Sequence, residues 1–143
     1  MKIHKSKIRK HPEVMKTIIK NPSLDPLVIL FNSDLYYIKQ KDKIISFLTI
    51  KRYFNKYYEM GTLYTAPEYR NRGYANKLMK EVIPKYKDIV VICHGEKIIS
   101  LNKKHGLKKT NKAGFVFDIK RNFFNFLFAP LLGYKKVTMR KQN

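Results

Sequence analysis

The sequence predicts an α/β fold with a mixed sheet. Short runs rich in Ile, Val, Tyr and Phe alternate with segments whose apolar residues recur at helical spacing. Residues 88–93 (DIVVIC) are almost continuously apolar, as in a strand covered on both faces. Residues 34–54 read as two strands around a polar turn, which predicts an antiparallel hairpin. No repeat or low-complexity linker interrupts the chain, so we expect one domain over residues 1–143.

The first half is predicted to begin with a strand over residues 1–8. A short helix follows in residues 11–20, because Pro12 stands at its start and Asn21-Pro22 at its end. The hairpin then turns at Gln40–Lys43, where the sequence becomes polar.

The second half starts with a strand over residues 56–66, which Pro67 ends. A helix is predicted from Tyr74 to Pro84, and a second one over residues 96–105 with Gly106 as its C-terminal cap. The runs GLKKT and AGFVFDIK, residues 106–110 and 113–120, return to strand character.

Charge dominates the composition: 31 Lys and Arg stand against 10 Asp and Glu, a formal net charge of +21. Such a surface attracts polyanions, and it predicts an RNA or acidic protein partner. The alternative is an incidental basic surface, because 25 of the cations are lysine and Lys, Asn, Ile and Tyr are all residues that an AT-rich genome favours.

The single cysteine, Cys93, cannot form an internal disulfide, and the N-terminus shows no secretory signal pattern. The longest apolar stretch, residues 123–134, contains Asn, Pro and Gly and is shorter than the ~20 residues of a spanning helix. We therefore expect a protein of the reducing cytoplasm with no transmembrane segment, and we expect no metal site.

Residues 63–83 (LYTAPEYRNRGYANKLMKEVI) combine a strand, a turn and a helix. The first N–H groups of a helix lack partners and the helix dipole makes that end partly positive, so phosphate is a natural ligand there. Gly73 and Ala75 keep the turn free of bulk, and Arg70 and Arg72 add charge. The alternative is an ordinary turn with solvated arginines.

This stretch resembles motif A of the GNAT superfamily of N-acetyltransferases, in which a strand and a Pro-containing turn precede Q/R-x-x-G-x-G/A at the start of a helix. Arg70, Gly73 and Ala75 occupy the three specified places. The next family element also follows in order: DIVVIC, EKIISLNKK and then HGL. The resemblance spans roughly residues 35 to 109 and implies a mostly antiparallel central sheet flanked by helices. Residues 121–143 are the least family-like part.

The resemblance implies that the protein is an N-acyltransferase with acetyl-coenzyme A as cosubstrate and a primary amine as acceptor, attacking directly in a ternary complex. It also implies two groups of cofactor-binding residues. The pyrophosphate would lie on the backbone amides of Arg70, Asn71, Arg72, Gly73, Tyr74 and Ala75. The pantetheine arm would lie along Leu63, Tyr64 and Thr65.

Acetyl transfer to an amine needs a base, because an ammonium has no lone pair. Glu59 lies six residues before Thr65, where some family members carry a catalytic glutamate. In a regular strand Glu59 would share a face with Leu63 and Thr65, whereas a bulge would change this. The alternative for Glu59 is a strand carboxylate that neutralises nearby lysines.

Two positions depart from the family pattern. Many members carry a tyrosine four residues before the glycine of the later motif, which can protonate the leaving thiolate, and this chain has Asn102 there. The family's usual asparagine at the start of the same helix is Gly95. An amide can hydrogen-bond the cofactor but is no acid, so we expect His94, or more weakly Tyr134, as the substitute, or else water. The alternative for His94 is an exposed turn residue.

The sequence NFFNFLFAPLLGYKK, residues 122–136, is predicted to form a closing strand pair or a self-association surface, which would favour a homodimer. An interfacial membrane anchor is the alternative, since Arg121, Lys135 and Lys136 flank the apolar run. A second function class follows: a weakly catalytic or non-catalytic coenzyme A-binding module that associates with nucleic acid or membrane.

Overall fold

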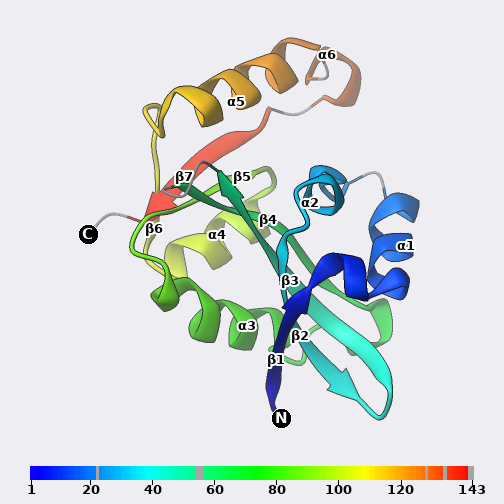
Figure 1. Cartoon of the computed structure of the whole chain (residues 1–143). Helices are drawn as coiled ribbons and strands as arrows, with labels where there is room; N and C mark the ends of the chain where they lie inside the picture. The colour runs from blue at the N-terminus through cyan, green and yellow to red at the C-terminus, as the bar shows by residue number, and fades with distance from the viewer. Residues whose placement is uncertain (22, 54–56, 128, 134, 142–143) are drawn as a thin grey trace. The chain divides into compact units, whose positions relative to one another are not determined.

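The computed structural model describes residues 1–21, 23–53, 57–127, 129–133 and 135–141 (Figure 1). The chain forms two compact units, Met1–Tyr86 and Lys87–Asn143. We describe each unit by itself, and the single domain over residues 1–143 stays a prediction.

The first unit contains an antiparallel sheet in which consecutive strands are neighbours. Its strands are β1 (Ile3–Lys7), β2 (Asp34–Gln40), β3 (Lys43–Tyr53) and β4 (Tyr57–Thr65). Its helices are α1 (Pro12–Lys20), α2 (Leu27–Leu30) and α3 (Tyr74–Val82), with 3-10 turns η1 (Ile8–Lys10), η2 (Pro67–Tyr69) and η3 (Ile83–Lys85).

Helices cover both faces of this sheet (Figure 1). On one face, Val14 and Ile18 of α1 and Val28 of α2 pack in a buried cluster with strand residues that include Phe47. We call this the α1 face. Helix α3 contacts β2, β3 and β4 on the opposite face, the α3 face, where the Tyr36 and Tyr86 hydroxyls form a 2.9 Å hydrogen bond.

Strand β4 contains a bulge. Leu63 pairs with Leu48 and Met60 pairs with Ile50, so two β4 residues, Gly61 and Thr62, stand opposite Thr49. The Thr62 N–H donates a hydrogen bond of 2.8 Å to Thr49 Oγ1 rather than to the strand backbone. The extra residue reverses the alternation of side chains beyond the bulge.

The second unit contains a three-stranded antiparallel sheet in the order β5-β7-β6. Its strands are β5 (Ile89–Cys93), β6 (Leu107–Lys109) and β7 (Val137–Lys141). Helix α4 (Glu96–Lys104) joins β5 to β6, and α5 (Phe115–Leu127) and α6 (Ala129–Leu132) lie between β6 and β7 in the chain. None of the helices in the described part of the chain has the length and hydropathy to cross a bilayer.

The prediction of an α/β fold with mostly antiparallel strands and flanking helices is confirmed. The strand predicted at residues 113–120 is wrong, because α5 begins at Phe115, and the strand pair predicted at residues 122–136 is replaced by the rest of α5 and by α6. The apolar run has no clear period of two, whereas the polar Asp118, Arg121 and Asn125 recur every three or four residues, as on one side of a helix.

The bulge generates a prediction about Gly61. A Cβ at this position would lie well inside van der Waals contact with Cγ1 of the fully buried Val28. Gly61→Ala should therefore lower the free energy of unfolding by about 1–3 kcal/mol. Chemical denaturation would measure this change. Val28→Ala removes the contacting methyl group, so the double variant should lose less than the sum of the two single variants. If the two losses of unfolding free energy were strictly additive, contact with Val28 would not be the reason why position 61 excludes a side chain.

Candidate functional site

The turn between β4 and α3 has the features that the motif predicted for anion binding. Gly73, the residue before α3, has φ +79°, a left-handed conformation that favours glycine. No side chain caps the helix, and a Cβ on Gly73 would meet nothing within 4 Å. The first N–H groups of α3 therefore have no capping side chain as acceptor, and the helix dipole makes this end partly positive.

Arginines and an aromatic ring surround this turn. The Arg72 guanidinium lies 5.6 Å from the centre of the Tyr69 ring, and Arg70 Nε donates a 3.2 Å hydrogen bond to the Thr65 carbonyl. Both arginines are exposed. The turn thus combines two cations with uncapped amides directly beside the end of β4.

The end of β4 divides its side chains between the two faces. Thr65 pairs with Ser46 and Leu63 with Leu48, so these side chains lie on the α3 face. The Tyr64 ring lies on the α1 face, tilted against the Phe47 ring with 5.2 Å between the two ring centres. Ser46 Oγ donates a 2.9 Å hydrogen bond to the Tyr64 carbonyl and lies 2.8 Å from Thr65 Oγ1.

Glu59 lies on the α1 face, opposite Lys51, and not with Leu63 and Thr65. The face expected for a regular strand is therefore corrected: the bulge lies between Glu59 and the end of the strand. Glu59 is 2% exposed, and its Oε2 lies 3.0 Å from Lys51 Nζ and accepts a 2.8 Å hydrogen bond from the Tyr53 hydroxyl.

Lys51 joins Glu59 to a second carboxylate. Its Nζ also forms an ion pair with Asp25, which precedes α2, and the Lys51 side chain is 0% exposed. Burial and the neighbouring Glu59 raise the pKa of Tyr53, so its phenol stays a hydrogen-bond donor. In this cluster of Asp25, Lys51, Tyr53 and Glu59, the two carboxylates thus share one ammonium.

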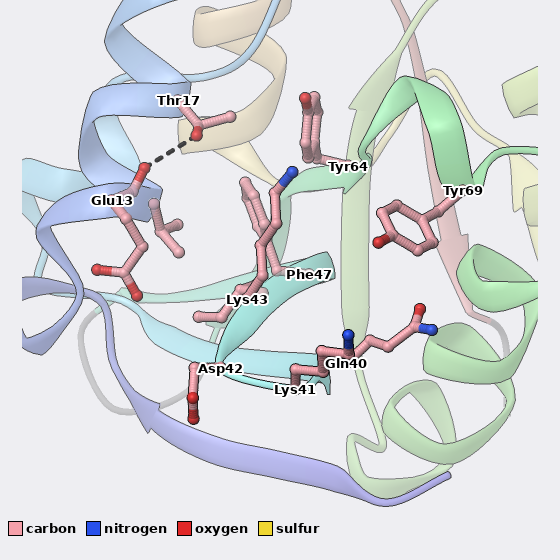
Figure 2. A pocket seen from close by; sticks show the side chains of 11 residues that line it. Glu13, Thr17, Gln40, Lys41, Asp42, Lys43, Phe47, Tyr64 and Tyr69 are labelled. Atoms are coloured by element: carbon pink, nitrogen blue, oxygen red, sulfur yellow. Dashed lines mark hydrogen bonds between the residues drawn. The ribbon is translucent and has the colours of Figure 1, made fainter.

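A cavity of about 730 Å³ opens on the α1 face of the first unit. Figure 2 shows Glu13 and Thr17 of α1 on one side and Tyr69 on the other, with Lys43 and Phe47 between them. The remaining lining residues are Val14, Gln40, Lys41, Asp42, Ile44 and Tyr64.

Two charged side chains at the rim of this cavity have polar partners. The Glu13 side chain is 58% exposed and lies 3.1 Å from His11 Nδ1, and Lys43 Nζ lies 2.8 Å from Glu68 Oε1. The floor is apolar and aromatic, formed by Phe47 and Tyr64. The cavity therefore suits a ligand with an apolar body and a charged or polar end.

The other predicted residues, His94 and Asn102, belong to the second unit. Burial, with a smaller effect of the Lys136 ammonium, lowers the pKa of His94, so its imidazole is neutral at pH 7. Asn102 is 0% exposed; its Nδ2 donates a 3.4 Å hydrogen bond to Cys93 Sγ, and its Oδ1 has no hydrogen-bond partner in the described part of the chain. Burial raises the pKa of the Cys93 thiol, and Tyr134 lies outside the described residues.

The first unit brings together the predicted turn, residues 70–75, and the end of β4. Glu59 instead lies in the buried ion-pair cluster, whose other members the sequence reasoning missed, as it missed the cavity. One signal was available: Lys51 directly follows the mainly apolar run IISFLTI, residues 44–50, and a lysine that is buried needs carboxylates. Among the described residues, no group of three or more His, Cys, Asp and Glu could hold a metal ion.

Comparison with known proteins links this geometry to one family. The family model described as the acetyltransferase (GNAT) family matches residues 7–103. Among curated proteins, none matches the sequence significantly.

Solved structures share the fold at low sequence identity. A GNAT family acetyltransferase from Elizabethkingia anophelis with acetyl-CoA bound is 18% identical with a TM-score of 0.62, over 99% of this chain and 97% of that one. A Bacillus subtilis acetyltransferase in complex with CoA is 12% identical with a TM-score of 0.71, over 99% of each chain. An IAA acetyltransferase from Bacillus cereus is 11% identical with a TM-score of 0.69, also over 99% of each chain.

The buried cluster predicts an asymmetry between two lysines. Lys51→Met would leave the carboxylates of Asp25 and Glu59 without their shared ammonium, so it should lower the free energy of unfolding by about 3–5 kcal/mol. Lys43→Met is the matched control, because the Lys43–Glu68 ion pair is exposed to solvent. The denaturation midpoint of this variant should equal that of the parent protein within error. Equal effects of the two substitutions on denaturation would contradict this assignment.

Proposed function

This chain belongs to the GNAT family of acetyltransferases, and we propose that it transfers an acetyl group from acetyl-coenzyme A to a primary amine. The observation that carries the proposal is the turn before α3, where a left-handed glycine and a helix start without a side-chain cap lie with two arginines beside the end of β4. The acetyl-CoA or CoA bound to two of the compared proteins supports the same cosubstrate here.

We assign the cofactor contacts as follows. The pyrophosphate would lie on the amides of residues 70–75 with Arg70 and Arg72 beside it, since donors and cations there match its charge. The pantetheine would run along Leu63, Tyr64 and Thr65. Asn102, in the second unit, stays a proposed cofactor contact on the family resemblance alone.

The amine would attack the thioester directly, in a ternary complex. A covalent route would need an activated nucleophile, and the protein's one thiol is a poor candidate, because Cys93 is buried with a raised pKa and stays protonated. Direct attack requires only that the ammonium lose its proton and that the leaving thiolate gain one.

Glu59 is the proposed base. A carboxylate can take a proton from an ammonium, and the resemblance to family members with a catalytic glutamate at this position supports the assignment. Because Glu59 is 2% exposed, the proton would reach it through water or through a neighbouring group. For the thiolate we propose water as the proton donor at neutral pH, since the lowered pKa of His94 leaves its protonated form populated only in acid.

The acceptor is proposed to enter the cavity on the α1 face, where Glu13 could meet an ammonium and Phe47 and Tyr64 an apolar body. The net charge of +21 supports an amine carried by an anionic macromolecule, such as tRNA, a ribosomal component or an acidic protein. Cytoplasmic action is part of this proposal.

A second candidate function has one specific observation in its favour. Asn102 stands where many family members carry a tyrosine acid, which favours a weakly catalytic or non-catalytic coenzyme A-binding module. Such a protein would bind the cofactor and release no thiol with any amine.

The cofactor site generates a prediction about Gly73. Gly73→Glu would place a bulky anion beside the phosphates, so it should weaken coenzyme A binding at least tenfold, about 1.4 kcal/mol, in isothermal titration. Gly106→Glu is the matched control, because Gly106 has φ +80° and equally open surroundings but follows α4. A folded Gly73→Glu protein with unchanged affinity would remove the proposed phosphate site.

The proposed base generates a prediction about turnover. Glu59→Gln keeps the shape but not the basicity, so thiol release with an amine acceptor should fall by ~10²–10⁴ while coenzyme A affinity persists. The loss should shrink at high pH, where free amine accumulates. Glu81→Gln, the same change on the exposed side of α3, is the control. Parent-like turnover near neutral pH would reassign Glu59 to stability alone, and no thiol release by the parent protein with any amine would favour the binding module.

A further inference from the structure

Helix α5 is amphipathic in the opposite sense to a normal surface helix, because its polar side faces the protein. Arg121 Nη1 donates hydrogen bonds of 3.4 Å to the Thr110 carbonyl and to Thr138 Oγ1. The Asn125 side chain bonds both backbone groups of Lys136, at 2.7 and 3.0 Å. These polar contacts hold α5 on the second unit, beside β7 (Figure 1).

The apolar side of α5 faces solvent. Phe115 is 81% exposed and Phe126 is 80% exposed, and Leu131 of the following α6 is 82% exposed. At about 100° per residue, the exposed apolar residues of α5 fall within an arc of about 120°. This α5–α6 apolar surface consists of Phe115, Val116, Ile119, Phe123, Phe126, Leu127 and Leu131.

Packing within the described part of the second unit does not account for this surface. Phe117, which lies on the other side of α5, is 2% exposed and supplies the core contact of the helix. In contrast, α1 buries Val14 and Ile18, and α3 buries an apolar side made of Leu78, Met79 and Val82. A contiguous run of exposed large apolar side chains on a helix that is held by its polar side indicates a binding surface.

The charge around this surface distinguishes its partners. Residues 97–143 contain twelve Lys and Arg and one acidic residue, Asp118. Asp118 lies on the inward side, where its Oδ1 accepts a 3.3 Å hydrogen bond from the Ala113 N–H and lies 3.5 Å from Arg121 Nη1. Lys112 precedes α5, Lys120 borders the apolar arc and Lys135 follows α6, so the surface is apolar in the middle and basic around it.

We propose that the α5–α6 apolar surface docks on an anionic phospholipid bilayer, with α5 lying in the plane of the interface. Aromatic and aliphatic side chains would enter the acyl boundary while flanking lysines meet lipid phosphates. A second copy of this chain fits less well, because it would bring two strongly basic surfaces together. A nucleic acid fits the lysines and its bases can stack on phenylalanine rings, but it offers no apolar surface for the aliphatic Ile119, Leu127 and Leu131. This proposal does not depend on acetyltransferase activity.

Vesicle flotation tests the proposal with the full chain. The protein should float with vesicles of phosphatidylcholine that contain phosphatidylserine, and little with phosphatidylcholine alone, and binding should weaken as salt rises above about 0.15 M. Phe115→Ser with Phe126→Ser should reduce the partition coefficient about tenfold or more. Ile19→Ser with Leu30→Ser removes apolar groups of similar exposure from α1 and α2 and should leave it within about twofold.

A fluorescent reporter tests where the helix lies and does not rely on a destabilising change. The chain has no tryptophan, so Phe126→Trp introduces a single probe at a position that is 80% exposed. Its emission should shift to the blue on adding the anionic vesicles, whereas the emission of Ile19→Trp on α1 should not shift. A blue shift at both positions would indicate unspecific adsorption and contradict the proposal.

Three other outcomes would overturn it. The parent protein could fail to bind the anionic vesicles, or it could bind neutral ones equally well, which would remove the electrostatic part. The third outcome is a parent protein that does not bind vesicles but sediments as a dimer. If Phe115→Ser with Phe126→Ser abolished that dimer, the surface would be a contact between copies of this chain.

Discussion

The candidate site depends on one buried lysine. Among the described residues, Lys51 is the one cation with a buried side chain, in a protein whose other cations are solvated at least in part. An ammonium inside a protein is tolerated only with anionic partners, and Asp25 and Glu59 supply them. The requirement ties the segment before α2 to β3 and β4, so the position of Glu59 and the fold of this region are determined together.

The bulge in β4 then decides which groups can act together. Before it, Glu59 lies on the α1 face, while beyond it Leu63 and Thr65 lie on the α3 face and Tyr64 on the α1 face. In the proposed reaction, the α1 face would hold the base and the amine, and the turn beside α3 would hold the cofactor. One inserted residue thus allows a single strand to serve two ligands, because it reverses the alternation midway.

In the second unit, polar contacts determine how helix α5 is oriented. Helix α5 is held by hydrogen bonds of Arg121 and Asn125 and by the buried Phe117, whereas Phe115, Phe123 and Phe126 stay exposed. These hydrogen bonds fix its orientation, since turning the helix over would leave the Thr110 carbonyl and the Lys136 backbone groups without these partners. The exposed apolar side of α5 is therefore a stable property of the fold. The flanking lysines favour an anionic partner for it.

The sequence by itself determined the order of most strands and helices and the phosphate-type turn. These depend on local signals: apolar periodicity, Pro12 and Pro67 at boundaries, and Gly73 before α3. The assignment failed at residues 113–120, where an apolar run fits either period. Only the tertiary structure decided that Lys51 pairs with Glu59, that a bulge separates Glu59 from Leu63, and which side of α5 faces solvent. Each of these depends on contacts between residues that are distant in the sequence, and a local sequence pattern does not specify such contacts.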